Sequence, residues 1–134
     1  MSLQFGTVLR TALVTAIETA IGASPKVRIY TGAPPANPAA AATGTLLAEF
    51  ALGADWAAQA SGVLTFSGVP ISTAAVAPGT AGYYRLLDNP GTVTHMQGTV
   101  TATGGGGDMT VDNPVIANTQ QVQITSWTIT APNA

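Results

Sequence analysis

Cysteine is absent from this 134-residue chain, and charged side chains are scarce. Without cysteine there is no disulfide, no thiolate nucleophile and no cysteine-ligated zinc. Charged residues make up 7% of the chain, four basic and six acidic, against about 25% in an ordinary soluble domain. A single histidine, His95, is too little for a transition-metal site. We therefore expect neither an enzyme nor a bound cofactor.

The same scarcity argues against nucleic acid and membranes as partners. A nucleic-acid-binding surface needs clustered Lys and Arg, and the nearest approach to a cluster is Lys26 with Arg28. An anionic membrane surface needs the same basic residues. Much of the surface must instead be Thr, Ser, Gln, Ala and Gly, which lose little hydration when a partner covers them. This composition favours burial in an assembly, although β-rich secreted proteins also tolerate low charge.

The N-terminal region predicts one amphipathic helix over residues 7–21. Apolar side chains recur there at spacings of three and four, at Ala12, Leu13, Ala16, Ile17, Ala20 and Ile21. Gly22 follows, where the end of a helix favours glycine. We expect the helix to cover an end or an open face of the remaining structure. A secretory signal is the rival interpretation, but Glu18 interrupts the apolar run and no small-residue cleavage site follows.

Beyond the helix, short runs with two-residue alternation predict strands between Gly/Pro turns. A hairpin is predicted over Tyr83–Val100, because Pro90 and Gly91 have the backbone preferences of a turn. Val69–Val76 is expected at a sheet edge, since Pro70 cannot sit in a central strand. Other strands are predicted at 26–31, 45–52, 63–67, 99–103, 109–111, 115–116 and 120–131. In the last of these, apolar residues change parity, so either both faces are covered or a β-bulge near Thr125–Ser126 turns the strand; we favour the bulge.

These elements predict a mainly β fold: an antiparallel, jelly-roll-like β-sandwich with one N-terminal helix. The prediction is a single domain over residues 1–134, with an N-terminal arm and helix over 1–23. Three prolines at 34, 35 and 38 indicate a long polyproline-like surface loop. Four consecutive glycines at 104–107 indicate a flexible turn.

No residue pattern predicts chemistry. His95 lacks a nucleophile elbow nearby, and the spacing of Asp108 and Asp112 does not match a calcium loop. Trp56 is expected to lie over the edge of the core. The aromatic residues leave open a carbohydrate-binding module that stacks sugars on exposed rings; the candidates are Trp56, Trp127, Tyr83 and Tyr84.

Three segments carry a resemblance to a known class of proteins. They are AIGASPKVRIYTGAPPANPAAAATGTLLAEF (20–50), GTAGYYRLLD (79–88) and MTVDNPVIANTQQVQITSWTITA (109–131). Together they resemble small structural proteins of tailed bacteriophages that are encoded near the head genes. Such proteins look like capsid decoration, or cement, proteins, some of which have jelly-roll-like folds.

The resemblance implies a non-enzymatic virion protein on the outer surface of the capsid. Its expected partners are the major capsid protein and further copies of itself, as a homodimer or homotrimer. The expected contact residues are Arg10, with the arm that precedes it, and Pro34, Pro35 and Pro38 of the loop. A tail, neck or fibre component is the alternative within the virion.

Overall fold

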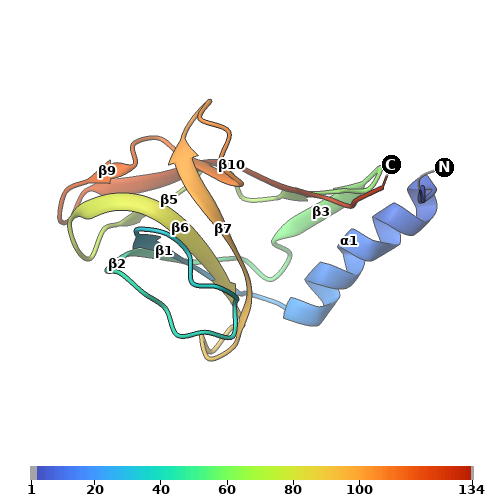
Figure 1. The fold of residues 1–134 in the computed structure, drawn as a ribbon, viewed down its shortest axis with the longest axis horizontal. Coiled ribbons are helices and arrows are strands. Elements are labelled where there is room, and N and C mark those ends of the chain that lie inside the picture. Colours follow the sequence, from blue (N-terminus) through green and yellow to red (C-terminus); the bar gives the residue numbers. More distant parts are fainter. Residues whose placement is uncertain (1–2, 134) are drawn as a thin grey trace.

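One α-helix precedes ten strands in the computed structural model, which describes residues 3–133 (Figure 1). The elements are α1 (Thr7–Ile21), β1 (Lys26–Thr31), β2 (Leu46–Ala51), β3 (Ala57–Ala60), β4 (Val63–Phe66), β5 (Ile71–Ala74), β6 (Gly79–Leu87), β7 (Thr94–Ala102), β8 (Met109–Val111), β9 (Val115–Ile116) and β10 (Gln121–Thr130). The prediction of a mainly β fold with an N-terminal helix is confirmed. Gly22 ends α1 as predicted, with a φ of 85° and its N–H donating to the Glu18 carbonyl.

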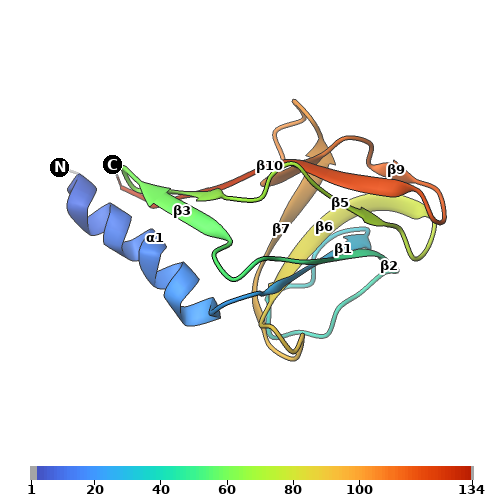
Figure 2. The ribbon, with the colours of Figure 1, turned by 180° about the vertical axis from the view of Figure 1, so that it is seen from behind.

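The strands are hydrogen-bonded into one curled, mixed sheet. Its order is β2-β1-β6-β7-β8-β10-β4-β3, with β5 beside β10 and β9 beside β6. The curl brings distant strands together: the Val76 N–H, just after β5, donates to the Leu47 carbonyl of β2 at 2.8 Å (Figures 1 and 2). Among the described strands, every pair is antiparallel except β7 and β8. The prediction of a purely antiparallel fold is wrong at that pair.

The parallel β7–β8 pair depends on the glycine run. Parallel neighbours usually need a connection of a dozen residues or more, yet only residues 103–108 join these two. The connection runs back along β7, and a Cβ on Gly105 or Gly107 would lie 2.8 Å from the Thr101 side chain. Asp108 completes the reversal, because its carboxylate accepts the Thr99 N–H at 2.9 Å. Gly105 and Gly107 thus pack against β7, whereas nothing lies within 4 Å of a Cβ on Gly104 or Gly106.

The long strand β10 contains the predicted bulge. Its register against β8 shifts between Ile124 and Ser126. Val122 and Ile124 are buried before the bulge, and Trp127 is buried after it, so the extra residue turns the opposite parity toward the core. The prediction of a bulge is confirmed. The edge position of β5 is also confirmed, because β5 pairs with β10 alone.

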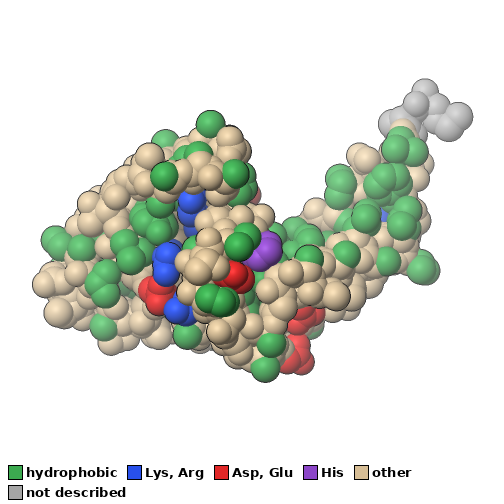
Figure 3. Space-filling model, turned by 90° about the horizontal axis from the view of Figure 1, so that it is seen from below, with side chains coloured by type: hydrophobic (Ala, Val, Ile, Leu, Met, Phe, Trp, Pro, Cys, Tyr) green, Lys and Arg blue, Asp and Glu red, His purple; other side chains and the backbone are tan. Residues whose placement is uncertain are grey.

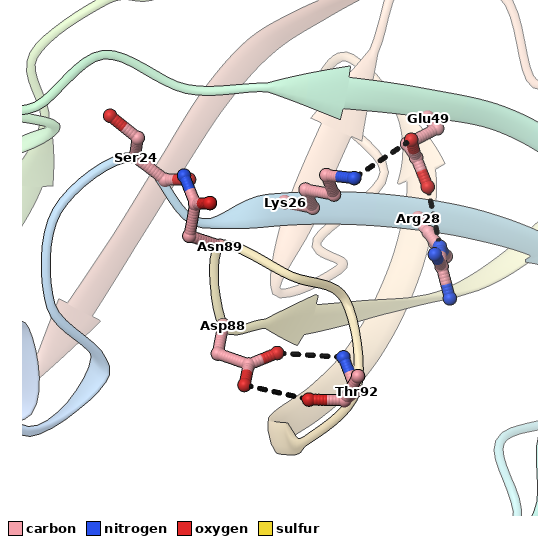
Figure 4. Close-up of polar contacts among 7 residues, drawn as sticks. All are labelled: Ser24, Lys26, Arg28, Glu49, Asp88, Asn89 and Thr92. Carbon is pink, nitrogen blue, oxygen red and sulfur yellow. Dashed lines mark hydrogen bonds and ion pairs between the residues drawn. The ribbon is translucent and has the colours of Figure 1, made fainter.

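The β6–β7 hairpin has the predicted turn, and its geometry is set by Asp88 (Figure 4). The Asp88 carboxylate accepts the N–H of Thr92 at 2.7 Å and that of Val93 at 3.0 Å. These hydrogen bonds, with the Val93 N–H first, hold the pKa of Asp88 below its ordinary value. Gly91 has a φ of 76°, which favours glycine at this position. Asn89 then ties the turn to the segment before β1 by donating to the Ser24 carbonyl.

Four aromatic side chains form the centre of the core: Trp56, Phe66, Tyr84 and Trp127. The rings of Phe66 and Trp127 lie 4.3 Å apart, and Tyr84 meets Trp127 edge-on at 5.2 Å. Trp127 Nε1 donates to the Tyr84 hydroxyl at 2.9 Å. Burial raises the pKa of Tyr84 to about 12. All three of the Trp56, Tyr84 and Trp127 side chains are buried.

The molecule has two parts that share β10. We call α1, β3, β4 and residues 128–130 of β10 the extension, and the remaining strands the body. Figure 1 shows the extension reaching away from the curled sheet, with α1 beneath β3. Residues 128–130 pair with β4, whereas the earlier part of β10 pairs with β5 and β8. One continuous strand therefore joins the two parts.

Candidate interaction surface

The helix α1 packs on β3 and β4 through a side that is half apolar and half polar; its residues are Arg10, Thr11, Val14, Ile17, Glu18 and Ile21. Val14 is 1% exposed and is the apolar contact at the centre of this side. One turn to either side, Arg10 Nη2 donates to the Ala131 carbonyl at 2.8 Å, and Glu18 accepts a hydrogen bond from Gln59 of β3. The Thr11 hydroxyl accepts the Gly62 N–H at 2.9 Å. Hydrogen bonds to β3, to the turn between β3 and β4, and to the residue after β10 thus orient the helix.

The opposite side of α1 is exposed and mostly apolar, with the hydroxyl groups of Thr15 and Thr19 beside its apolar residues. We call these apolar residues the α1 outer face; they are Val8, Leu9, Ala12, Leu13, Ala16 and Ala20. Val8 is 87% exposed, Leu9 50% and Leu13 40%. No charged residue belongs to this face, because Arg10 and Glu18 both point toward the strands. Figure 3 shows hydrophobic side chains gathered along the extension.

The face of α1 that the sequence predicted to be buried is therefore mostly exposed. Of the six periodic apolar residues, Ile21 is buried and Ile17 is half-buried, whereas the other four are exposed. The periodicity identified an apolar stripe correctly but could not tell whether this chain covers it. A contiguous exposed apolar patch on a folded protein is typical of an interaction site.

Arg10, which the sequence placed among the contact residues, is half-buried and holds the helix to the strands. Besides its bond to Ala131, its side chain packs on Gly62, where a Cβ would lie 2.9 Å from Arg10 Cβ. Its Nε is buried without a partner among the described residues. Of the arm that precedes it, residues 1 and 2 lie outside the described residues. Arg10 thus lies on the buried side of α1, opposite the α1 outer face, and fixes the orientation of the helix.

The proline loop (residues 32–45), between β1 and β2, folds over the side of β6 and β7 that faces away from the core. Pro34, Pro35 and Pro38 are half-buried. Three side chains of the sheet hold its backbone: Gln97 donates to the Pro35 carbonyl at 2.6 Å, Arg85 to the Ala40 carbonyl at 2.8 Å, and Tyr83 to the Thr43 carbonyl at 2.6 Å. The prolines are therefore held in place on the body and remain partly accessible.

These three anchors were not foreseen from the sequence, although a signal was present. Residues 83–87 read YYRLL and contain one polar residue, and a strand without alternation is typical of burial on both faces. One face of β6 lies in the core. The other is covered by the proline loop, and Tyr83 stacks on Tyr30 there with ring centroids 5.1 Å apart.

The remaining candidates from the sequence stay separate in space. His95 is exposed and borders a small cavity of about 170 Å³ with Ile17, Ala20, Ile21 and Met96. The Asp112 carboxylate accepts the Gln123 N–H at 3.0 Å, a local structural bond. Within residues 3–133, no three His, Asp or Glu side chains gather closely enough to hold a metal ion.

The aromatic side chains proposed for sugar stacking are buried. Trp56 and Trp127 are each 2% exposed, and Tyr83 and Tyr84 are equally enclosed. Trp56 Nε1 donates to the Gly22 carbonyl at 3.0 Å, which fixes this core ring to the end of α1. The expectation of exposed rings is therefore corrected: these side chains build the core.

No protein-family model matches the chain, and no curated protein or solved structure is significantly similar to it. Across residues 3–133, none of the helices has the length and apolar character needed to cross a bilayer. The arguments about function below therefore depend on the surface geometry and on the resemblance described above.

Proposed function

We propose that this chain is a non-enzymatic virion structural protein that decorates the outer surface of a phage capsid. In this proposal it stabilises the shell by bridging neighbouring major capsid protein subunits, as a homodimer or homotrimer. The observation that carries the proposal is the α1 outer face, which is apolar, free of charge and exposed on the extension. The resemblance to small phage head proteins supports the particular role.

The α1 outer face suits contact with a second copy of itself. Identical faces that carry charge repel one another, and this face carries none. Ala12, Ala16 and Ala20 leave room for two helices to approach closely. Full burial of a Leu or Val side chain contributes roughly 1.5–3 kcal/mol, so Val8, Leu9 and Leu13 supply a modest contact. Many such copies on a shell bind tightly together through avidity.

The low charge of the whole chain supports the same role. With 7% charged residues, few ions must be desolvated when a partner covers the surface. The exposed sides of the proline loop and the body are thus also suited to contact with a shell. We further propose that the curled sheet is a variant of the jelly-roll sandwich that the resemblance implies. It differs from that fold in the parallel pairing of β7 with β8.

Two charge-introducing variants test the proposal. Leu13→Glu places a carboxylate in the α1 outer face, and Val115→Glu does the same at an exposed valine of the body. We expect the native protein and Val115→Glu to form a dimer or trimer and to co-sediment with undecorated heads at a saturating, symmetric stoichiometry. Leu13→Glu should be monomeric and should bind heads at least about tenfold more weakly, because avidity is lost.

A native chain that is monomeric and has no affinity for heads would falsify the proposal. A chain that self-associates through α1 but binds tails or necks would instead favour the alternative position in the virion. Imaging of labelled protein on purified particles separates the head from the tail.

A further inference from the structure

Arg85 is a buried cation in the middle of β6. Arg85 as a whole is 4% exposed. Nη2 donates to the Ala40 carbonyl at 2.8 Å and to Gln97 Oε1 at 3.2 Å, and both acceptors are uncharged. Nε is buried and makes no hydrogen bond to a described residue. A guanidinium carries five N–H donors, so much of its capacity is unused within this chain.

No carboxylate of the described residues pairs with Arg85. Glu49 lies two strands away from Arg85 in the ladder; it is bonded to Arg28 at 2.6 Å and lies 3.8 Å from Lys26 (Figure 4). The bond to Glu49 raises the pKa of Arg28 above its ordinary value. Asp88 is occupied by its own turn. Three of the chain's four basic side chains thus share this side of the sheet with one paired acid.

Arg85 lines a cavity between the proline loop and the β6–β7 turn. This Arg85 cavity has a volume of about 410 Å³. Its walls are residues 38–41 of the loop, Arg85 itself, and the hairpin residues Thr92, Val93 and Thr94. Arg28 lies on the neighbouring strand, directly paired with Arg85 in the ladder. The cavity is therefore bordered by the positive charge of Arg85, by Thr94 and by Thr92, whose hydroxyl donates to Asp88.

A buried charge without a counter-ion is strongly destabilising, and it is normally compensated by an ion pair or a bound ion. The planar guanidinium fork matches a carboxylate especially well. Arg28, the basic residue paired with Arg85 in the ladder, already has Glu49 as its partner, so Arg85 alone fits one negative charge better than two. We propose that the Arg85 cavity binds a carboxylate, with Arg85 as the cation that recognises it.

Free small carboxylates and acidic side chains of a protein partner share this chemistry. An NMR titration at constant ionic strength separates them, with sodium acetate in one arm, acetyl-glutamate-amide in the second and sodium chloride as the reference. We expect saturable shifts confined to the Arg85 side chain and the backbone amides of residues 39–41 and 92–94. Equal affinity for both carboxylates indicates a small-molecule site, whereas tighter binding of the glutamate derivative indicates an acidic side chain of a partner.

Matched arginine variants test the assignment to Arg85. Arg85→Lys keeps the charge but loses the fork, and we expect it to bind at least roughly tenfold more weakly, the factor for losing one charge-assisted hydrogen bond. Arg28→Lys, on the same side of the sheet, should bind within about twofold of the native protein. Should Arg85→Lys fail to fold, Val93→Trp serves in its place, because it narrows the cavity and leaves Arg85 unchanged. We expect it to weaken binding by a similar factor.

Two results would overturn the inference. One is a linear shift with acetate and with the glutamate derivative that matches chloride. The other is an equal loss of affinity in Arg28→Lys and Arg85→Lys, which would indicate only the general positive charge of this side of the sheet.

Discussion

Gly82 of β6 packs directly against the backbone of Gly32, the residue that follows β1. A Cβ there would lie 1.9 Å from the Gly32 carbonyl oxygen, a distance that no structure tolerates. We predict that Gly82→Ala lowers the free energy of unfolding by about 1–3 kcal/mol, the usual range for overpacking. Gly68→Ala is the control, because nothing lies within 4 Å of its Cβ position. Urea denaturation measures both, and equal stabilities would contradict the argument.

Tyr84 makes stability depend on pH in the alkaline range. Its pKa is raised from an ordinary value of 10.0 to about 12 by burial, so the folded state favours the neutral phenol. The stabilisation is complete below pH 10 and is lost as the pH rises through about 12. We expect the urea midpoint to fall across this window, together with the appearance of tyrosinate absorbance. In Tyr84→Phe the fall should be smaller, and an unchanged fall would assign it to another group.

At the scale of the element, one side of α1 is buried and contributes to stability, whereas the other is exposed. Val14→Ala should lower the free energy of unfolding by about 1–3 kcal/mol, because it leaves a cavity between α1 and the strands. Leu13→Ala removes a larger side chain from the α1 outer face, yet the monomer should change by less than about 0.5 kcal/mol. Denaturation at low protein concentration, where self-association is absent, checks both values. The reverse order would mean that α1 packs through its apolar stripe.

Local preferences decided the elements that the sequence predicted well. The helix bounds, the hairpin turn and the bulge in β10 follow from Gly22, Gly91 and the parity change before Trp127. Each depends on a few neighbouring residues whose backbone preferences are strong. The structure confirms all three.

Long-range contacts decided the elements that the sequence did not predict. The strand β3 is missing from the predicted strands, because its AAQA sequence has no strand preference of its own; it forms by pairing with β4. The parallel β7–β8 pair departs from the ordinary rule on connection length. The anchors of the proline loop lie 40 or more residues from the carbonyls they hold, as in the bond from Tyr83 to Thr43. The Arg85 cavity was missed for the same reason.

For the molecule as a whole, the scarcity of charge predicts how association responds to salt. Contacts through the α1 outer face are apolar, so the dissociation constant of the oligomer should change by less than about twofold between about 50 mM and about 500 mM sodium chloride. Sodium sulfate should strengthen association, since it favours apolar burial. Sedimentation equilibrium measures both effects. A tenfold weakening in sodium chloride would indicate an ionic contact elsewhere on the surface.

The strand β10 crosses from the body into the extension without interruption. A helix tethered by a loop would swing and absorb a pull. Here, tension applied to α1 passes through Arg10 and Ala131 into β10, where the ladder bonds lie across the strand and resist the pull together in shear. A second molecule attached through α1 would therefore be held rigidly to the body.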